Sequence, residues 1–389
     1  MNKVILKKNE DHRITNGHLW AFSNEIAAME GEPLPGDIVK LFNHQKKFLG
    51  AGIFNPNSLI AVRLLSREDE TIDFQFFKKR IEAALDLRKK IYANTETYRL
   101  VHGEGDLLPG LIVDKFDDYL AVQTFSVGMD RRLTLICDVL ESLLHPKGII
   151  ERNEALVRTM EGLEQRKGIL RGSVTPVTIS EYGVQYTIDL LEGQKTGFFL
   201  DQRENRRAFR RYVNGANVLD CFCNEGGFAL NAAYAEAASV VGVDISEPVI
   251  RRAIKNTELN KLAHSAKFFT GDAFEYLEHA VSNGKKFDVI NLDPPSFAKS
   301  KKTVSKAIRG YKEIHTNACK LLNTGGFLAT ESCSHNVTEE SFLSVIDDGA
   351  RSAGRTLKLL EWHGAAPDHP VLPSMPETRY LKFGIFQID

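Results

Sequence analysis

The second half of the sequence, from about residue 178 onward, alternates near-continuous apolar runs with amphipathic segments. This alternation constrains the fold more than any other feature of the chain. Runs such as NVLDCF and FDVINLD are typical of strands buried on both faces, and the segments between them have helical periodicity. The pattern predicts a doubly wound α/β domain built on a parallel sheet, with a ligand crevice at the carboxyl ends of the strands.

The first half of the chain has a different pattern. Residues 1–72 contain short β segments separated by turn-forming residues, whereas residues 74–91 have the spacing of an amphipathic helix. Mixed strand and helix patterns then continue to about residue 177. We therefore expect a β-rich domain at 1–72, a central α+β domain at 73–177 and the doubly wound domain at 178–389.

Composition excludes several classes of protein. No segment approaches the roughly 20 apolar residues that span a bilayer, and the N-terminus does not have the apolar stretch of a secretory signal. We therefore expect a cytoplasmic protein with no membrane partner. The five cysteines have neither zinc-site spacing nor the density of a disulfide framework, so we expect reduced thiols and no metal.

Acidic residues follow three successive strands of the predicted sheet. Asp220 lies near the end of the first strand, Asp244 ends the second and Asp272 the third. Glycines after the first strand let a ligand approach the backbone, and a helix N-terminus offers N–H groups to an anion. Cys223 and Asn224 stand where a dinucleotide-binding loop would have glycines. The set predicts a nucleoside-type cofactor other than a dinucleotide.

These motifs resemble those of class I S-adenosylmethionine-dependent methyltransferases. In that family the first loop holds the methionine end of the cofactor, the second acid holds the ribose and the third holds the adenine. The resemblance implies cofactor contacts from Asp220, Cys223, Asn224, Gly226, Gly227, Asp244, Ile245, Asp272 and Ala273.

The fourth strand ends in D-P-P, where Pro294 and Pro295 fix a rigid turn after Asp293. The turn could be purely structural, but it resembles the substrate-facing motif of methyltransferases that act on nucleobases. The resemblance implies that Asp293 borders the cofactor and hydrogen-bonds the ring edge of the target base, beside both prolines. Phe297 is a candidate stacking partner for an extruded base, or equally a core residue.

Cys333 ends the strand that follows Asp293, so both side chains should open into one crevice. Carbon 5 of a pyrimidine attacks a methylsulfonium only after a thiolate has added to carbon 6. Lysines after Asp293 would favour that thiolate. The competing interpretation is a small buried hydrophobe, but the neighbours Ser332, Ser334 and His335 indicate an accessible cysteine.

The family is indicated by S-C-S, D-P-P-x-F and GQKTGFFLDQRENRR together. These segments resemble bacterial large-subunit ribosomal RNA cytosine-5 methyltransferases, which carry an N-terminal PUA domain that binds RNA, and the resemblance covers nearly the whole chain. It implies that Cys333 is the nucleophile and that Asp293 supports the base. It also places Phe199 and Gln202 near the cofactor. Ser296 stands where many relatives have a second cysteine, so the base that removes the carbon 5 proton is not identified.

Two basic runs, at 203–211 and 299–309, lie beside the expected crevice. Each could be an ordinary solvated helix face, but their places after KTGFFLDQ and DPPSF favour contacts with phosphates. The candidate RNA-binding residues are Arg203, Arg206, Lys299, Lys301 and Lys302.

Two alternatives stay open. Relatives with D-P-P methylate a base nitrogen of guanine or adenine without an enzyme nucleophile, and a catalytically silent RNA-binding protein could keep the same fold. The expected partner is RNA, most simply ribosomal RNA. The sequence does not identify the modified nucleotide or whether free RNA or an assembled particle is the substrate, and it is compatible with a homodimer.

Overall fold

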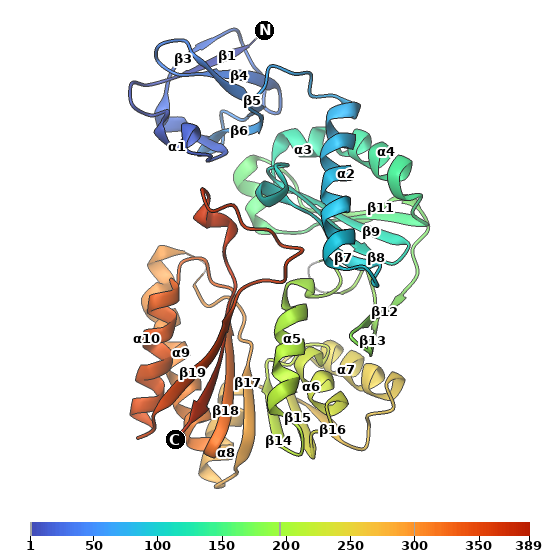
Figure 1. Cartoon of the computed structure of the whole chain (residues 1–389), viewed down its shortest axis with the longest axis vertical. Helices are drawn as coiled ribbons and strands as arrows, with labels where there is room; N and C mark the ends of the chain where they lie inside the picture. The colour runs from blue at the N-terminus through green and yellow to red at the C-terminus, as the bar shows by residue number, and fades with distance from the viewer. Residues whose placement is uncertain (1, 194–195, 299) are drawn as a thin grey trace. The chain divides into compact units, whose positions relative to one another are not determined.

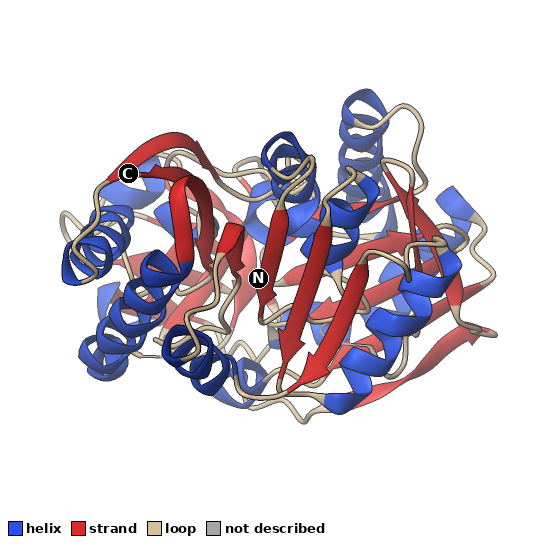
Figure 2. Ribbon diagram, turned by 90° about the horizontal axis from the view of Figure 1, so that it is seen from below, coloured by secondary structure: helices blue, strands red, loops and turns tan. Residues whose placement is uncertain are grey.

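The computed structural model describes residues 2–193, 196–298 and 300–389. The chain divides into two compact units, between which it passes several times (Figure 1). Unit 1 consists of Met1–Ile179, Ile188–Leu200 and Pro367–Thr378, and unit 2 consists of Ser180–Thr187, Asp201–Ala366 and Arg379–Asp389. Both units contain helices and strands, which Figure 2 colours blue and red.

Unit 1 begins with a six-stranded sheet whose order is β2-β6-β5-β4-β1-β3. Its core includes Val4, Leu41 and Leu64, and it also includes Met375 from the late segment of unit 1. The strands are β1 (Lys3–Leu6), β2 (Trp20–Phe22), β3 (Ile26–Glu30), β4 (Ile38–Phe42), β5 (Phe48–Phe54) and β6 (Ile60–Ser66).

A five-stranded sheet of order β11-β10-β9-β8-β7 follows in unit 1. The helix α2 (Phe74–Ile91) begins at the capping residue Asp73, whose side chain accepts hydrogen bonds from the N–H groups of Gln75 and Phe76. Its apolar face packs with α4 over this sheet. The other elements are β7 (Thr97–His102), β8 (Leu111–Phe116), β9 (Tyr119–Thr124), α3 (Val127–Arg131), α4 (Leu133–Leu144), β10 (Gly148–Asn153) and β11 (Arg166–Gly172).

The late segment Pro367–Thr378 is bound to the rest of unit 1 by hydrogen bonds. The guanidinium of Arg88 donates to the backbone carbonyl of Asp368 at 2.6 Å, and the N–H of Arg99 donates to the Asp368 carboxylate at 2.9 Å. Our predicted boundaries assign 188–200 and 367–378 to the doubly wound domain, whereas both segments pack with unit 1. A short two-stranded sheet, β12 (Val177–Glu181) and β13 (Val184–Ile188), lies at the division.

Unit 2 is built on a seven-stranded sheet of order β16-β15-β14-β17-β18-β20-β19. Neighbouring strands from β16 to β18 are parallel, and β20 pairs antiparallel with both β18 and β19. The chain leaves β14 in one direction and returns to its other side at β17, which makes the carboxyl ends of β14 and β17 the topological switch point. The strands are β14 (Asn217–Cys221), β15 (Ser239–Asp244), β16 (Ala266–Thr270), β17 (Phe287–Leu292), β18 (Leu322–Ser332), β19 (Leu357–His363) and β20 (Lys382–Ile388).

Helices cover both faces of this sheet (Figure 1). Successive residues of one strand alternate between the two cores, since Val289 packs with α5 and α6 whereas Ile290 packs with α8, α9 and α10. The predicted doubly wound fold is therefore confirmed. The helices are α5 (Arg203–Phe209), α6 (Gly227–Tyr234), α7 (Glu247–Leu259), α8 (Ala273–Ser282), α9 (Val304–Leu321) and α10 (Glu339–Ser352).

Candidate functional site

The loop between β14 and α6 contains an unusual run of left-handed backbone conformations. Phe222, Asn224 and Gly226 have φ angles of 62°, 49° and 84°. A Cβ atom at Gly226 would lie 3.1 Å from the ring of Phe268, so a side chain at this position would meet both strain and crowding. The loop therefore runs close to the sheet and presents backbone rather than side chains.

Asp220 anchors this loop through hydrogen bonds. Its carboxylate accepts hydrogen bonds from the backbone N–H of Ala229 at 2.8 Å and from Nδ2 of Asn291 at 2.9 Å. The side chain is fully buried, and burial raises its pKa to about 7. We therefore assign Asp220 to holding the loop in place, whereas our prediction had it lining the ligand space.

Asp244 is only half-buried at the end of β15. Its two oxygens accept hydrogen bonds from the N–H groups of Asn224 at 3.0 Å and Ser246 at 2.9 Å. Each oxygen keeps a second lone pair for a ligand hydroxyl. Ile245, the next residue, is 70% exposed, which leaves an apolar surface beside the carboxylate.

Asp272 caps the helix α8, because its side chain accepts a hydrogen bond from the N–H of Phe274 at 2.7 Å. It is half-buried, and Ala273 behind it is buried. Cys223 in the first loop is also buried, and burial raises the pKa of its thiol well above the ordinary value. The predicted acids at the strand ends are therefore brought to one edge of the sheet, with Asp244 and Asp272 accessible.

The D-P-P turn follows β17. The N–H of Asp293 donates to the carbonyl of Cys221 at 3.2 Å, which ties the turn to the end of β14. Pro294 is buried and Pro295 exposed. Phe297 is half-buried and lies 4.8 Å from the ring of Tyr311 between centroids, so the structure places it against the core side of the turn.

The segment around Cys333 is bound to the D-P-P segment. The hydroxyls of Ser334 and Ser296 are 3.1 Å apart, and the N–H of Ala298 donates to the Ser334 hydroxyl at 3.4 Å. Burial raises the pKa of Tyr311 to about 12, and the negative charges of Cys333 and Asp293 add to this effect. The two segments that carry the predicted catalytic side chains are therefore hydrogen-bonded to each other.

Cys333 is half-buried, whereas the other four cysteines of the chain are buried. The expected accessibility of its neighbours is correct for His335, which is exposed, but wrong for Ser332 and Ser334, whose side chains are fully buried. The reason is that both hydroxyls bond inward: Tyr311 Oη donates to Ser332 Oγ at 2.9 Å, and the backbone N–H of Ser334 donates to the same atom at 3.3 Å.

Glu331 is a site residue that the sequence did not reveal. It is fully buried one residue beyond the last paired residues of β17 and β18, Leu292 and Thr330. Gln202 donates a hydrogen bond from Nε2 to its carboxyl group. Burial raises the pKa of Glu331 well above its ordinary value, and the charge of Asp293 adds to the rise. Burial therefore favours the neutral form of Glu331 more than in a free carboxyl group, and Gln202 is buried as its hydrogen-bond partner.

The expected RNA contacts of Arg203 and Arg206 are wrong. Both side chains are 2% exposed and lie against the carboxylate of Glu181. Arg206 bonds it twice, from Nε and Nη2, at 2.7 Å each. A phosphate would have to displace this buried pair, so only other arginines of the run, such as Arg207, are accessible.

The lysines after the D-P-P turn and Phe199 are the remaining predicted residues. Lys299 lies outside the described residues, Lys302 is exposed, and Lys301 and Lys302 belong to a short 3-10 turn, η6 (Lys301–Thr303). Phe199 is half-buried and belongs to unit 1, so its role near the cofactor stays a prediction.

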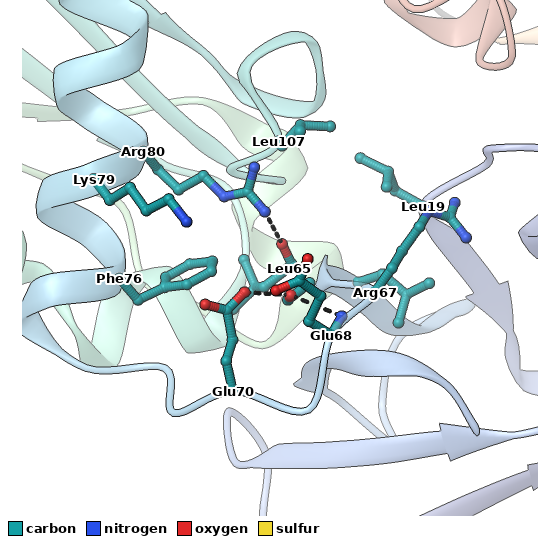
Figure 3. A pocket seen from close by; sticks show the side chains of 11 residues that line it. Leu19, Leu65, Arg67, Glu68, Glu70, Phe76, Lys79, Arg80 and Leu107 are labelled. Atoms are coloured by element: carbon teal, nitrogen blue, oxygen red, sulfur yellow. Dashed lines mark hydrogen bonds between the residues drawn. The ribbon is translucent and has the colours of Figure 1, made fainter.

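Unit 1 contains a separate pocket of about 250 Å³ (Figure 3). Its charged groups have both signs and are engaged internally: Arg67 donates to the carbonyl of Ile14 at 2.8 Å, and Ser66 bonds Glu70 at 2.5 Å. None of the predicted site residues lines it. The lining residues are Leu19, Leu64, Leu65, Ser66, Arg67, Glu68, Glu70, Phe76, Lys79, Arg80 and Leu107.

Within residues 2–193, 196–298 and 300–389, no group of three or more His, Cys, Asp or Glu side chains is arranged to hold a metal ion. Over that same part of the chain, no helix has both the length and the apolar character that crossing a bilayer requires.

Comparison with known proteins matches both halves of the chain. The model of a PUA-like domain matches residues 4–67, and the model of a methyltransferase domain matches residues 213–363. Among solved structures, that of SMU.776 complexed with SAH has a TM-score of 0.87 at 22% identity and covers 100% of both chains. The M. jannaschii tRNA m1G37 methyltransferase has a TM-score of 0.51 at 18% identity, covering 85% of this chain and 83% of that one. These likenesses concern the fold.

Sequence relatives match the chain over almost its full length. The ribosomal RNA large subunit methyltransferase I of Escherichia coli O157:H7 is 38% identical over 386 residues, which cover 98% of each chain. The protein of the same name from Shigella boydii serotype 4 matches equally, with 38% identity and 98% coverage of each chain. The chain belongs to the family of the ribosomal RNA large subunit methyltransferase I proteins.

Proposed function

We propose that the protein transfers the methyl group of S-adenosylmethionine to carbon 5 of a cytosine in large-subunit ribosomal RNA, through a covalent bond between Cys333 and carbon 6. The observation that carries this proposal is the half-buried Cys333 on a segment that is hydrogen-bonded to the D-P-P segment, in a chain of the methyltransferase I family. The coarser part, methyl transfer to ribosomal RNA, rests on the similarity to relatives. The finer part, the covalent route, rests on the chemistry of the site.

The strand ends of unit 2 fit S-adenosylmethionine, which supplies an electrophilic methyl group when bound. The loop at 222–226 follows the end of β14, and its half-buried residues Phe222 and Asn224 would lie at the methionine end. Asp244 and Asp272 have free lone pairs for hydroxyl or amine donors, and Ile245 offers an exposed apolar contact for a planar base. The cofactor would be held by Gly226, Gly227, Asp244, Ile245, Asp272 and the backbone around Asn224.

Cys333 supplies the step that a pyrimidine carbon cannot perform alone. The thiolate lone pair forms the S–C6 bond, the C5=C6 electron pair moves so that C5 becomes nucleophilic, and C5 then takes the methyl group. Loss of the C5 proton to a base restores the C5=C6 bond and expels the thiolate, so the enzyme is unchanged overall. Asp293 hydrogen-bonds the ring edge and keeps the base in register with the sulfur.

The buried carboxyl of Glu331 supports the role of Asp293. Burial favours the neutral form of Glu331, which disfavours a second negative charge beside Asp293. Gln202 keeps this carboxyl in position. The carboxylate that meets the base edge in this proposal is that of Asp293, on a rigid turn.

Methylation by Cys333→Ala protein tests the proposal. We expect loss of 5-methylcytosine formation on unmodified large-subunit RNA, with S-adenosylmethionine binding and thermal stability unchanged. Retained turnover would instead mean that a base nitrogen is the methyl acceptor, as in the m1G37 enzyme of similar fold. Absence of S-adenosylmethionine binding by the wild-type chain would favour a silent RNA-binding protein.

A further inference from the structure

The residue opposite the end of the Cys333 strand is a buried lysine. Lys382 is the first residue of β20 and pairs with Ser332, the last residue of β18. It is only 5% exposed. A lysine ammonium is rarely buried without partners, so its surroundings need an explanation.

The ammonium of Lys382 holds the turn that follows Cys333. Its Nζ donates to the backbone carbonyl of Ser334 at 2.9 Å and to that of Val337 at 2.8 Å. The turn is closed by a hydrogen bond from the N–H of Val337 to the carbonyl of Ser334 at 3.2 Å. An ammonium has three N–H donors, and within the described part of the chain the third has no hydrogen-bond acceptor.

The charges of three residues near Lys382 act on its ammonium. Burial lowers the pKa of Lys382, whereas the negative charges of Cys333 and Glu339 raise it and Arg379 lowers it. Glu339 already pairs with Arg379, at 2.7 Å between Oε1 and Nη2. The two carbonyls that accept from Lys382 carry only partial charge, and Cys333 stands between Ser332, which pairs with Lys382 across the sheet, and Ser334, whose carbonyl accepts from its ammonium.

The other titratable groups nearby do not compete for this role. Burial and the charge of Lys382 both lower the pKa of His335, so the imidazole is neutral at pH 7. Tyr311, on α9, donates its hydroxyl to Ser332 and stays protonated, because burial raises its pKa to about 12. Lys382 on β20 is therefore the cation that the fold places at the turn after the proposed nucleophile, Cys333.

We propose that Lys382 is a positioning residue for the methyl transfer: its ammonium fixes the turn after Cys333 and stabilises the thiolate of Cys333. This inference rests on the proposed function only for its catalytic meaning. The proposed charge interaction between Lys382 and Cys333 does not require substrate. Deprotonation of the Cys333 thiol leaves S⁻ beside an ammonium that keeps its three protons, so no proton passes between the two groups.

Alkylation of the full-length protein by iodoacetamide tests the contact without RNA. Cys333 is the half-buried cysteine and the other four are buried, so its peptide reports its own thiolate fraction by mass spectrometry. With Lys382→Met we expect the midpoint of the alkylation profile to rise by about one pH unit, which makes the reaction about tenfold slower near neutral pH. Lys382→Arg, which keeps the charge, should retain the wild-type midpoint. An unchanged midpoint in folded Lys382→Met protein would overturn the inference.

A second pair of variants keeps Lys382 and so does not depend on the folding of Lys382→Met. Cys333→Asp places an ionisable carboxyl group near the sulfur position, and Cys333→Asn places a neutral group of the same size. We expect a higher Tm for Cys333→Asp than for Cys333→Asn at pH 7, and equal values below the pKa of the new carboxyl. Equal values at pH 7 would contradict the contact.

The two proposals fail separately. Methylation retained by Cys333→Ala would remove the covalent mechanism but leave the alkylation shift of Lys382→Met intact. An unshifted alkylation profile would remove the role of Lys382 while the covalent mechanism could still hold.

Discussion

The carboxylate of Asp220 accepts a hydrogen bond from Nδ2 of Asn291 at 2.9 Å, and this bond joins β14 to β17 beneath the candidate site. The same carboxylate accepts the N–H of Ala229 at the start of α6. One buried acid therefore connects the proposed cofactor loop to the strand that ends at Asp293. The same buried carboxylate would thus help to position both the substrate base and the methyl donor.

Asp220→Asn should change how stability depends on pH. Burial raises the pKa of Asp220 to about 7, so the folded state binds this proton more tightly than the unfolded chain does. Its stabilising contribution is fully present below about pH 4 and is lost as the pH rises to about 7. The amide cannot ionise, and Asn291 can rotate its own amide to accept from it, because Asn291 Oδ1 has no hydrogen-bond partner in the described part of the chain.

We therefore expect the Tm of Asp220→Asn, relative to wild type, to rise between pH 5 and pH 7.5. Thermal unfolding followed by circular dichroism at several pH values measures this difference. A difference that stays constant over that range would show that Asp220 titrates as it does in the unfolded chain.

Gly226→Ala should weaken S-adenosylmethionine binding. The residue has φ of 84°, and a methyl group would lie 3.1 Å from the ring of Phe268. Gly284→Ala is the matched control, since Gly284 also has positive φ, at 62°, but nothing lies within 4 Å of the added carbon. Both variants should lose about 1 kcal/mol of stability from the left-handed backbone, whereas only Gly226→Ala should lose about tenfold or more in cofactor affinity by calorimetry. Equal affinities would argue against this loop as the cofactor site.

Glu181→Gln should destabilise unit 2 strongly. The substitution leaves Arg203 and Arg206 buried without their counter-ion, which costs about 3–5 kcal/mol for a buried pair. Arg207→Gln is the control, because this arginine of the same helix is 60% exposed and should change stability by less than about 0.5 kcal/mol. Chemical denaturation measures both. A small effect of Glu181→Gln would mean that water reaches the two arginines.

The lysines after the D-P-P turn should contribute to RNA affinity through phosphates. We expect Lys299→Gln, Lys301→Gln and Lys302→Gln together to weaken RNA binding and to reduce the slope of log Kobs against log salt by about 2, at about 0.7 per lost single-strand contact. A triple variant of exposed lysines on other elements, Lys255, Lys267 and Lys285, serves as the control. Titrations at several salt concentrations give the slopes, and an unchanged slope would place the RNA elsewhere.

Much of the fold follows from apolar periodicity. The helix predicted at 74–91 is α2, because a long amphipathic repeat reports directly on which face is buried. The strand β11 (Arg166–Gly172) is harder to predict, because it lies at a sheet edge and carries charges on both faces. Its pairing partner is not its neighbour in a local pattern, so no short sequence motif marks it.

The position of β20 is a similar case. The two last strands are antiparallel neighbours, and β20 also inserts beside β18, which no local pattern could indicate. That insertion brings Lys382 to the turn after Cys333, across 48 residues of sequence.

The candidate site was predictable where a residue's position in its own strand decides its role. Asp244, Asp272 and Asp293 lie at strand ends, as the alternation of strands and helices implies. Glu331 was not predictable, because its importance depends on a partner, Gln202, that is 129 residues away. The arginine run misled for the same reason: charge is visible in a sequence, whereas burial against Glu181 is not.

The covalent bond between Cys333 and a cytosine is the central claim, and trapping that bond tests it most directly. Large-subunit RNA transcribed with 5-fluorocytidine cannot release a proton from carbon 5, so an adduct formed in the presence of S-adenosylmethionine should persist. We predict an RNA–protein complex that survives denaturing electrophoresis, maps to the Cys333 peptide by mass spectrometry and is absent with Cys333→Ala. Wild-type protein that methylates unsubstituted RNA yet forms no such complex, or forms it at another residue, would contradict the account.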